Sequence, residues 1–365
     1  MVINRFINGF PIGHDGKLHI IKIPSIIVVG EKAIEKVSDV ASKLGAERAL
    51  LVTGSTTWRI AGRIVRDLLE GEGIRVFTHY VNKASMSYVK PAISFYYANG
   101  GFDIVVGVGG GKNLDVGKVI AKETGSLFIS VPTTPSHDGI ASPFASLIER
   151  KGKHSMVATT PIAVIADTEI IAKAPKRFFK AGIGDVIANI NAVEDWKLAR
   201  DVVGEYYGEY AANLSLLSAL HLMKNLSDLI SDEIKATRTL IEALISSGIA
   251  MGIAGSSRPG SGSEHLISHA LDGLAAKPAL HGEQCALGTI MMLYYRGSDK
   301  LLEVYDFLMN VGMPLKAYEL GLSPEEIIQA LVKAPSIRPN RYTILHHKPL
   351  TLEKAKILAK EAGVI

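Results

Sequence analysis

Short apolar runs alternate with longer amphipathic segments through the first half of the chain. The apolar runs are rich in β-branched residues and have the length of buried strands, whereas the segments between them carry apolar residues at helical spacing. This alternation is typical of a parallel sheet with helices on both faces. The predicted strands are Ile26–Val29, Ala49–Thr53, Ile74–Tyr80, Ile104–Val108 and Leu127–Val131. The predicted helices are Ala33–Leu44, Thr57–Glu70, Tyr88–Asn99 and Leu114–Glu123.

The pattern changes near residue 170, after two further short apolar segments, Met156–Val157 and Ala163–Ile165, which we expect at the edge of the sheet. We therefore predict an α/β nucleotide-binding domain over residues 1–172 and an all-helical domain over residues 173–365. A ligand site is expected in the cleft between them. The helices predicted beyond this boundary are Arg177–Arg200, Glu205–Ser231, Lys235–Ala254, Ser263–Ala275, Gly282–Tyr295, Leu301–Val311, Pro324–Lys333 and Leu352–Ala362.

Composition narrows the possible partners and the cellular setting. Hydrophobic residues make up 47% of the chain, and the net charge is only +4, without a basic run interleaved with aromatic residues. These features argue against a nucleic-acid partner and are compatible with an anionic small substrate. No apolar run approaches the roughly 18 residues of a membrane span, so membrane insertion is not expected. Cys285 is the only cysteine, which excludes an intrachain disulfide and favours a cytoplasmic protein.

A glycine turn, Gly109-Gly110-Gly111, connects a predicted strand to a predicted helix. Glycines let backbone N–H groups approach a diphosphate, and the helix N-terminus adds a favourable dipole. We expect Lys112 to meet a phosphate oxygen and Asn113 to cap the helix. Neither standard fingerprint matches, because Lys112 stands where G-x-G-x-x-G requires glycine, and Val106 and Asn113 break the P-loop pattern. The loop therefore predicts a nucleotide site of another kind, with a simple tight turn as the alternative.

Hydroxyl side chains follow the next predicted strand, at Thr133, Thr134 and Ser136. Such residues commonly bind ribose or phosphate at the carboxyl edge of a parallel sheet. A proline-stiffened loop with helix-capping hydroxyls is the alternative.

Three candidate metal ligands, Asp185, His265 and His281, stand among glycines and helical patterns in the second half. A carboxylate and two imidazoles leave one coordination position open, which is how catalytic zinc is held. Taken singly, Asp185 is explained as a charge at a helix N-terminus, and a lone histidine is more often structural. However, His265 and His269 share a helix face, and His281 follows within seventeen positions of His265. This clustering favours a metal site.

The order of these motifs resembles the sn-glycerol-1-phosphate dehydrogenase family. That family belongs to a superfamily with glycerol dehydrogenases, iron-containing alcohol dehydrogenases and dehydroquinate synthase. The similar segments are GGGKNLDVGK, PTTPSHDGIASP, GIGDVIAN, GSEHLISHALD and KPALHGEQ, and the similarity continues to Arg341–Leu345. It implies reversible reduction of dihydroxyacetone phosphate to sn-glycerol 1-phosphate, the glycerol backbone of archaeal phospholipids. It also implies NAD(H) or NADP(H), one Zn²⁺ per subunit and a homo-oligomer, either a dimer or an octamer.

The resemblance also implies roles for particular residues. Asp185, His265 and His281 would bind the metal, and Asp138, Asp185 and His269 would be catalytic and contact the substrate. The cofactor would contact Gly109, Gly110, Gly111, Lys112, Asn113, Leu114, Asp115, Thr133, Thr134, Pro135, Ser136 and Ser142. Candidates for binding the substrate phosphate are Lys277, Arg258, Arg338, Arg341 and His347.

Cofactor choice and reaction type leave alternatives open. Gly54-Ser55-Thr56-Thr57 follows a predicted strand where related NAD-specific enzymes carry an acid. An acid would repel a 2′-phosphate and these residues would not, so use of both NADH and NADPH is expected. The rival functions are a glycerol dehydrogenase, a dehydroquinate-synthase-like lyase, and a nucleotide-binding regulator without turnover. Nickel in place of zinc is a further alternative, because affinity order alone does not select the metal.

Overall fold

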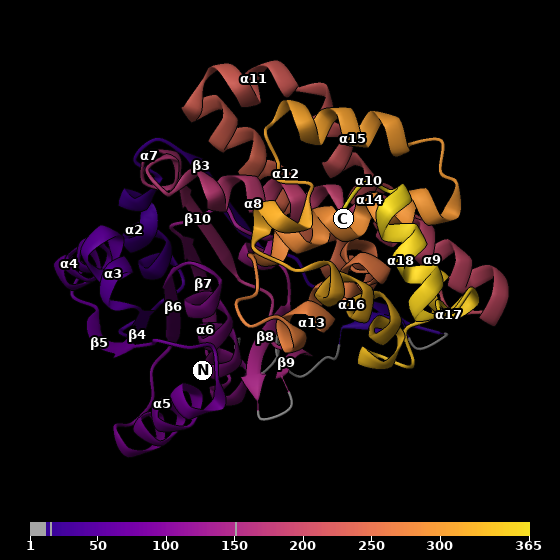
Figure 1. The fold of residues 1–365 in the computed structure, drawn as a ribbon. Helices are drawn as coiled ribbons and strands as arrows, with labels where there is room; N and C mark the ends of the chain where they lie inside the picture. Colours follow the sequence, from indigo (N-terminus) through magenta and orange to yellow (C-terminus); the bar gives the residue numbers. More distant parts are fainter. Residues whose placement is uncertain (1–11, 15–16, 150–151) are drawn as a thin grey trace.

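The computed structural model describes residues 12–14, 17–149 and 152–365, and it shows an α/β half beside a helical half (Figure 1). The α/β half contains a six-stranded parallel sheet with the strand order β3-β10-β7-β6-β4-β5. The predicted fold class, a parallel α/β sheet followed by a helical region, is therefore confirmed. The strands are β3 (Ile26–Gly30), β4 (Arg48–Thr53), β5 (Arg75–Tyr80), β6 (Ile104–Gly109), β7 (Leu127–Pro132) and β10 (Ala163–Asp167).

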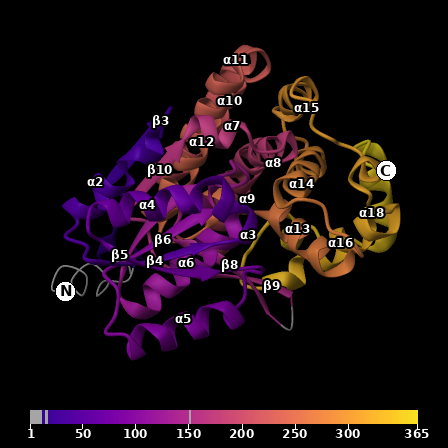
Figure 2. The same ribbon diagram turned by 90° about the vertical axis from the view of Figure 1, so that its left-hand side faces the viewer.

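Helices cover both faces of this sheet because successive strand residues point to opposite sides. On β4, Leu51 packs with α2 and α4, whereas Leu50 packs with α5 and α6. Figure 2 shows α4 and α5 on opposite sides of the strands. The helical segments of this half are η1 (Ala33–Glu35), α2 (Lys36–Lys43), α3 (Ser55–Thr57), η2 (Trp58–Gly62), α4 (Arg63–Gly71), α5 (Met86–Ala98) and α6 (Gly111–Thr124).

The prediction of additional edge strands was wrong in both cases. β10 lies inside the sheet, paired with β3 on one side and β7 on the other. Its residues are all buried, so both of its backbone edges need hydrogen-bonding partners within the sheet. Met156–Val157 belongs instead to a separate antiparallel hairpin of β8 (Phe144–Glu149) and β9 (Gly152–Val157). A third small sheet pairs β1 (Gly13–His14) with β2 (His19–Ile20).

The helical half follows the predicted pattern, but two predicted helices are each divided in two. The segment 177–200 is interrupted at Ala188, and the segment 205–231 at Asn225, whose side chain bonds the carbonyl of His221 at 2.7 Å and competes with the helix backbone. The elements are α7 (Thr168–Ala172), α8 (Lys176–Ile187), α9 (Asn189–Val203), α10 (Glu209–Lys224), α11 (Leu226–Ser231), α12 (Glu233–Ala254), η4 (Arg258–Gly260), α13 (Ser263–Leu274), α14 (His281–Arg296), α15 (Leu301–Asn310), η5 (Ala317–Leu320), α16 (Pro324–Ile337), α17 (Ile344–His347) and α18 (Leu352–Glu361).

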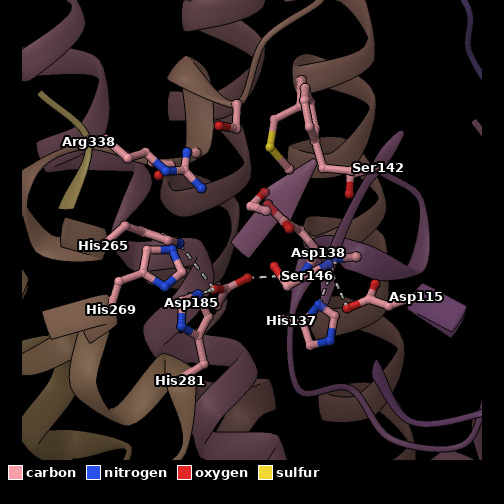
Figure 3. A pocket seen from close by; sticks show the side chains of 17 residues that line it. Asp115, His137, Asp138, Ser142, Ser146, Asp185, His265, His269, His281 and Arg338 are labelled. Atoms are coloured by element: carbon pink, nitrogen blue, oxygen red, sulfur yellow. Dashed lines mark hydrogen bonds and ion pairs between the residues drawn. The ribbon is translucent and has the colours of Figure 1, made fainter. Parts of the chain in front are cut away.

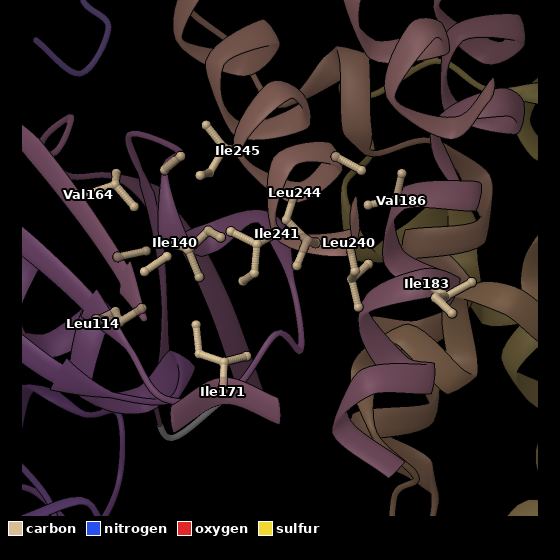
Figure 4. Packing of buried hydrophobic residues seen from close by; sticks show 14 of the residues in the cluster. Leu114, Ile140, Val164, Ile171, Ile183, Val186, Leu240, Ile241, Leu244 and Ile245 are labelled. Carbon is tan, nitrogen blue, oxygen red and sulfur yellow. The ribbon is translucent and has the colours of Figure 1, made fainter. Parts of the chain in front are cut away.

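One hydrophobic cluster runs from the sheet into the helical half. It joins Leu114 and Val164 of the α/β half to Ile183 of α8 and Leu240 of α12 (Figure 4). A shared core of this kind holds the facing surfaces of the two halves in a defined relation. In the part of the chain that the structure describes, no helix combines the length and the apolar character that a membrane crossing requires.

Candidate metal and cofactor site

Three helices bring the predicted metal ligands together (Figure 3). Asp185 comes from α8, His265 from α13 and His281 from the first residue of α14. The Asp185 Oδ1 atom lies 3.7 Å from His265 Nε2 and 3.6 Å from His281 Nε2. Oxygen and imidazole nitrogen atoms at this spacing can converge on one cation, and they match the donor types of catalytic zinc sites.

Hydrogen bonds orient both imidazoles so that Nε2 faces Asp185. His265 Nδ1 lies 2.9 Å from the buried carboxylate of Glu264, and His281 Nδ1 lies 2.9 Å from Ser268 Oγ. Metal-binding histidines typically use their second nitrogen in this way, and such contacts orient the ring toward the ion. The donor set and its supporting contacts therefore fit a zinc ion.

The electrostatics of the site also favour a cation. Burial lowers the pKa of His265, but Cys285 and Glu264 raise it, and the net pKa lies well above the ordinary value. Surroundings that raise the pKa of an imidazole stabilise positive charge, which a divalent ion would also supply.

Two glycines allow α8 and α14 to approach closely enough to join their ligands. A Cβ atom on Gly184 would lie 2.1 Å from the carbonyl oxygen of Gly282, and a Cβ on Gly282 would lie 1.7 Å from that of Ala181. Any larger side chain at either position would push the helices apart. The glycines beside Asp185 and His281 in the sequence are therefore needed for the contact between their helices.

Asp138 lies beside the metal ligands, in the short helix η3 (Asp138–Ile140). Its backbone N–H donates to Asp185 Oδ2 at 2.9 Å, and its own Oδ2 accepts from Ser247 Oγ at 2.8 Å. Burial, followed by the negative charge of Asp185, raises the pKa of Asp138 to about 7. A cation bound by Asp185 would offset the second effect and favour the carboxylate.

Asp138 and the three predicted metal ligands line a cavity of about 100 Å³ between the two halves, here called the metal pocket. His269 also faces it, one helical turn beyond His265. The remaining polar lining of the metal pocket includes Asp115, His137, Ser142, Ser146, Ser155, Ser257, Ser261 and Arg338.

A second cavity, of about 800 Å³, opens over the carboxyl edge of the sheet and is here called the glycine-loop cavity. His137 lies between the two cavities: it lines the metal pocket, and a Cβ on Gly111 would lie 2.0 Å from its Nε2 atom. The two cavities therefore adjoin. The predicted cofactor residues that line the glycine-loop cavity are Gly110, Gly111, Lys112, Asn113, Thr133, Thr134 and Ser136. Other residues of its lining include Thr56, Thr57, Ile60 and Phe178.

The prediction that Asn113 caps the helix was wrong. Helix α6 starts at Gly111 with Gly110 in the capping position, so the first amides remain directed toward the cavity. Asn113 is fully buried, and its Nδ2 atom donates to Thr57 Oγ1 at 3.0 Å and to Val108 O at 3.3 Å. It therefore ties α3 to the loop.

Other predicted cofactor residues lie away from the glycine-loop cavity. Leu114 packs in the hydrophobic core, and Asp115 faces the metal pocket, where it accepts from the Ser146 amide at 3.1 Å. Ser142 also lines the metal pocket. The carbonyl of Pro135 lies against Gly182 of α8, where a Cβ would come within 1.8 Å.

The structure separates the five cationic candidates for phosphate binding. Arg338 lines the metal pocket, and its side chain makes no hydrogen bond or ion pair with any described residue. Arg258 is paired with Glu205, and Arg341 donates to Ser261 O at 2.6 Å and to Ser257 Oγ at 2.8 Å. The last two candidates, Lys277 and His347, are exposed and lie outside the pocket.

Sequence reasoning did not identify several supporting residues. Glu264 and Ser268 were visible in the histidine motif, but their role depends on which histidine nitrogen they contact. Ser247 lies 109 positions from Asp138, and no local pattern indicates that pairing. Cys285 had a usable signal, since it follows His281 by one helical turn.

Comparisons with known proteins show which family the chain resembles. The family model of iron-containing alcohol dehydrogenases matches residues 28–175. Glycerol-1-phosphate dehydrogenase (NAD(P)+) of Hyperthermus butylicus is 47% identical over 354 residues, 95% of this chain and 99% of the relative. The protein of the same name from Thermococcus kodakarensis is 48% identical over 351 residues, 96% of this chain and 99% of the relative.

Solved structures agree at the level of the fold. Glycerol dehydrogenase from Schizosaccharomyces pombe superimposes with a TM-score of 0.81 at 21% identity, over 96% of this chain and 91% of that one. The resemblance inferred from the sequence motifs is thus confirmed by relatives that match almost end to end. The chain belongs to the glycerol-1-phosphate dehydrogenase (NAD(P)+) family.

Proposed function

We propose that the chain catalyses the reversible, NAD(P)H-dependent reduction of dihydroxyacetone phosphate to sn-glycerol 1-phosphate, with zinc held by Asp185, His265 and His281. The observation that carries this proposal is the junction of two cavities, one lined by the metal ligands and one by the glycine loop. The near full-length similarity to relatives of that name supports the same substrate and cofactor.

When bound, zinc supplies Lewis-acid polarisation of the substrate carbonyl, and the reduced nicotinamide supplies the hydride. The chain's own residues position the reactants. Backbone amides at the start of α6 face the glycine-loop cavity and would bind the cofactor diphosphate. A cofactor held there would lie against the carboxyl edge of the sheet, next to the metal pocket.

Asp138 and His269 are proposed to orient the triose. Asp138 is held between Ser247 and the Asp185 carboxylate, and His269 projects into the same pocket from α13. Hydrogen bonds between these groups and the substrate hydroxyls would present one face of the carbonyl to the hydride. Fixing that face determines the handedness of the product.

Arg338 is proposed to bind the substrate phosphate. Burial lowers its pKa, and burial, followed by the charges of Arg338 and Arg258, lowers the pKa of the adjacent Arg341 to about 9. These three arginines line a neighbouring cavity, and among the described residues of its lining only Glu205 carries a carboxylate. The excess positive charge would be offset by a phosphate dianion.

This arginine cluster favours a phosphate ester over free glycerol. Free glycerol carries no anionic group. With glycerol as the substrate, the half-buried guanidinium of Arg338 would have no charged partner. Net consumption of NADH distinguishes a dehydrogenase from the lyase alternative, because a lyase that uses NAD transiently consumes no NADH overall.

The test follows NADPH oxidation with dihydroxyacetone phosphate, before and after chelation and zinc restoration. The product is then offered to an enzyme specific for glycerol 3-phosphate of the opposite hand. Zinc-dependent turnover to a product which that enzyme ignores is the expected result. Activity on free glycerol alone, or on a lyase substrate without NADPH loss, would overturn the proposal.

We further propose that the chain acts in the cytoplasm as a homo-oligomer. One supporting feature is an apolar face of α10 at which Tyr210, Leu217 and Leu220 are exposed. An exposed apolar face is typical of a protein–protein contact. Light scattering after gel filtration distinguishes a dimer or an octamer from a monomer.

A further inference from the structure

The buried thiol of Cys285 has no part in the proposed reaction, although it lies at the metal site. Cys285 is the chain's only cysteine, and it follows His281 by four residues on α14, so both side chains share one helix face. Its Sγ atom lies 3.7 Å from His281 Nε2, the nitrogen that faces Asp185. The side chain is completely buried.

Donor atoms of Asp185, His265, His281 and Cys285 all lie within 4.8 Å of one another. A tetrahedral zinc ion with bonds of about 2.0–2.1 Å to nitrogen or oxygen and about 2.3 Å to sulfur would separate nitrogen from sulfur by about 3.6 Å and oxygen from nitrogen by about 3.3 Å. The observed separations are 3.7 Å for His281 to Cys285, and 3.6 and 3.7 Å for Asp185 to the two histidines. These three separations are close to the expected values, and the remaining donor pairs, all within 4.8 Å, would draw closer around a bound ion.

The imidazole orientation supports this reading independently of the thiol. Glu264 and Ser268 bond the Nδ1 atoms of the two histidines, which leaves both Nε2 atoms to face the same point. Cys285 Sγ lies beside that point. The thiol is therefore near the position that a metal would occupy, and Glu264 and Ser268 contact the opposite nitrogens of the two rings.

The thiol also lies on the side of the ligand set away from the substrate. Asp185, His265 and His281 all line the metal pocket, whereas Cys285 does not. A sulfur ligand from this direction would leave the pocket-facing position open. Zinc can expand to five ligands, so a fourth protein ligand is compatible with substrate binding.

We propose that Cys285 is a fourth protein ligand of the metal, bound as a thiolate on the side away from the substrate pocket. The sulfur–hydrogen bond breaks, the proton passes to solvent, and the sulfur lone pair binds the ion. A soft sulfur donor would favour zinc or cobalt over magnesium or manganese at this site. The proposal rests on the proposed metal-dependent function.

Cobalt substitution tests the proposal by spectroscopy. The purified chain is stripped with a chelator, loaded with one equivalent of Co²⁺, and compared with the metal-free protein by absorption. We expect visible ligand-field bands, which report bound cobalt, and a near-ultraviolet sulfur-to-cobalt charge-transfer band. Because the chain has one cysteine, a thiolate band can be assigned to Cys285.

Two variants control the assignment. C285S should keep the ligand-field bands and lose the charge-transfer band. M251L, which removes the thioether that lines the metal pocket, should keep both. Loss of the charge-transfer band in M251L instead of C285S would overturn the proposal.

X-ray absorption of the unmodified zinc-loaded chain provides a test that needs no variant. A sulfur shell at about 2.3 Å is expected beside the nitrogen and oxygen shell at about 2.0–2.1 Å. A zinc-loaded chain that reduces dihydroxyacetone phosphate but shows only nitrogen and oxygen ligands would overturn the Cys285 proposal and leave the proposed function intact. Absence of zinc-dependent turnover, with the sulfur shell present, would overturn only the function.

Discussion

Side chains that do not line the metal pocket orient the proposed metal ligands. Glu264 illustrates this, because it is fully buried and its carboxylate contacts His265 Nδ1, the Gly262 amide and Asn191. A charged acceptor with several partners holds the imidazole in one orientation. The ligand set therefore depends on a second layer of residues whose identity the ligands alone do not reveal.

Replacing Glu264 with glutamine should weaken zinc binding. The amide keeps the size of the side chain but removes the charge that orients His265, so the zinc Kd should rise about 10- to 100-fold. Competition with a coloured chelator measures this Kd. E353Q, an exposed substitution on α18, is the matched control and should leave the Kd unchanged. An unchanged Kd in E264Q would show that the contact does not support metal binding.

Arg338 is expected to distinguish the phosphate ester from free glycerol. A hydrogen bond to a charged group contributes about 1.5–3 kcal/mol, so R338M should lower kcat/KM for dihydroxyacetone phosphate about 10- to 150-fold. Any residual rate with unphosphorylated dihydroxyacetone should not change. K277M, at an exposed residue that does not line the metal pocket, serves as the control. Equal losses on both substrates would contradict a phosphate-binding role.

The residues after β4 should permit both dinucleotides. Thr56 and Thr57 line the glycine-loop cavity, and no acid stands between Gly54 and Thr57 to repel a 2′-phosphate. KM values for NADH and NADPH are expected within about tenfold of each other, since no unfavourable charge pair arises with either. Steady-state kinetics with each cofactor checks this. A preference for NADH of roughly a hundredfold would contradict it.

Helix contacts decide whether the ligands meet at all. Asp185 and His281 lie 96 positions apart in the sequence and become neighbours where the backbones of α8 and α14 touch at Gly184 and Gly282. The contact leaves no room for a side chain at Gly184 or Gly282. Packing of elements, rather than the chemistry of the ligands, is what limits substitution there.

G184A should therefore disturb both stability and metal binding. Its Cβ would meet the Gly282 carbonyl at 2.1 Å, and relief of that clash must move α8 or α14. Overpacking typically costs about 1–3 kcal/mol, so the thermal midpoint should fall and the zinc Kd should rise. The control is G273A on α13, where an added Cβ meets nothing within 4 Å. Alanine there should be neutral or stabilising, because it restricts the unfolded chain.

The two halves of the chain share one core, and this should govern how the protein unfolds. Residues of the sheet and of α8 and α12 pack in one cluster, so separation of the halves would expose that cluster to water (Figure 4). Two of the three proposed metal ligands, Asp185 on α8 and His281 on α14, lie on helices that pack in this cluster. Metal binding and the junction of the halves are thereby linked.

Removal of zinc should lower the thermal midpoint without dividing the transition. A ligand present at about 1,000 times its Kd stabilises the folded state by about 4 kcal/mol, and this contribution disappears on chelation. Scanning calorimetry with and without chelator should show one transition that moves to lower temperature. Two separate transitions would show that the halves unfold independently.

The periodic patterns along the chain predicted the alternation of strands and helices and the change near residue 170. The types and the clustering of Asp185, His265 and His281 predicted the metal site. Such features depend on local spacing, because a buried strand or an amphipathic helix carries its pattern within a few residues. Strand order did not follow from the pattern: β10 was expected at an edge and lies between β3 and β7. A buried run in the sequence does not specify its neighbours.

Residue identity and motif order were enough to predict the family of this protein and to propose Asp185, His265 and His281 as ligands, because both are local properties of the chain. The positions of the remaining groups followed from packing between distant segments. Arg338 lines the metal pocket, whereas Arg258 and Arg341 are bonded to other residues. Asn113 is buried and bonds Thr57 instead of capping the helix, and Cys285 lies beside His281. These outcomes depend on contacts between distant segments, whose distances and shared partners are properties of the packed chain alone.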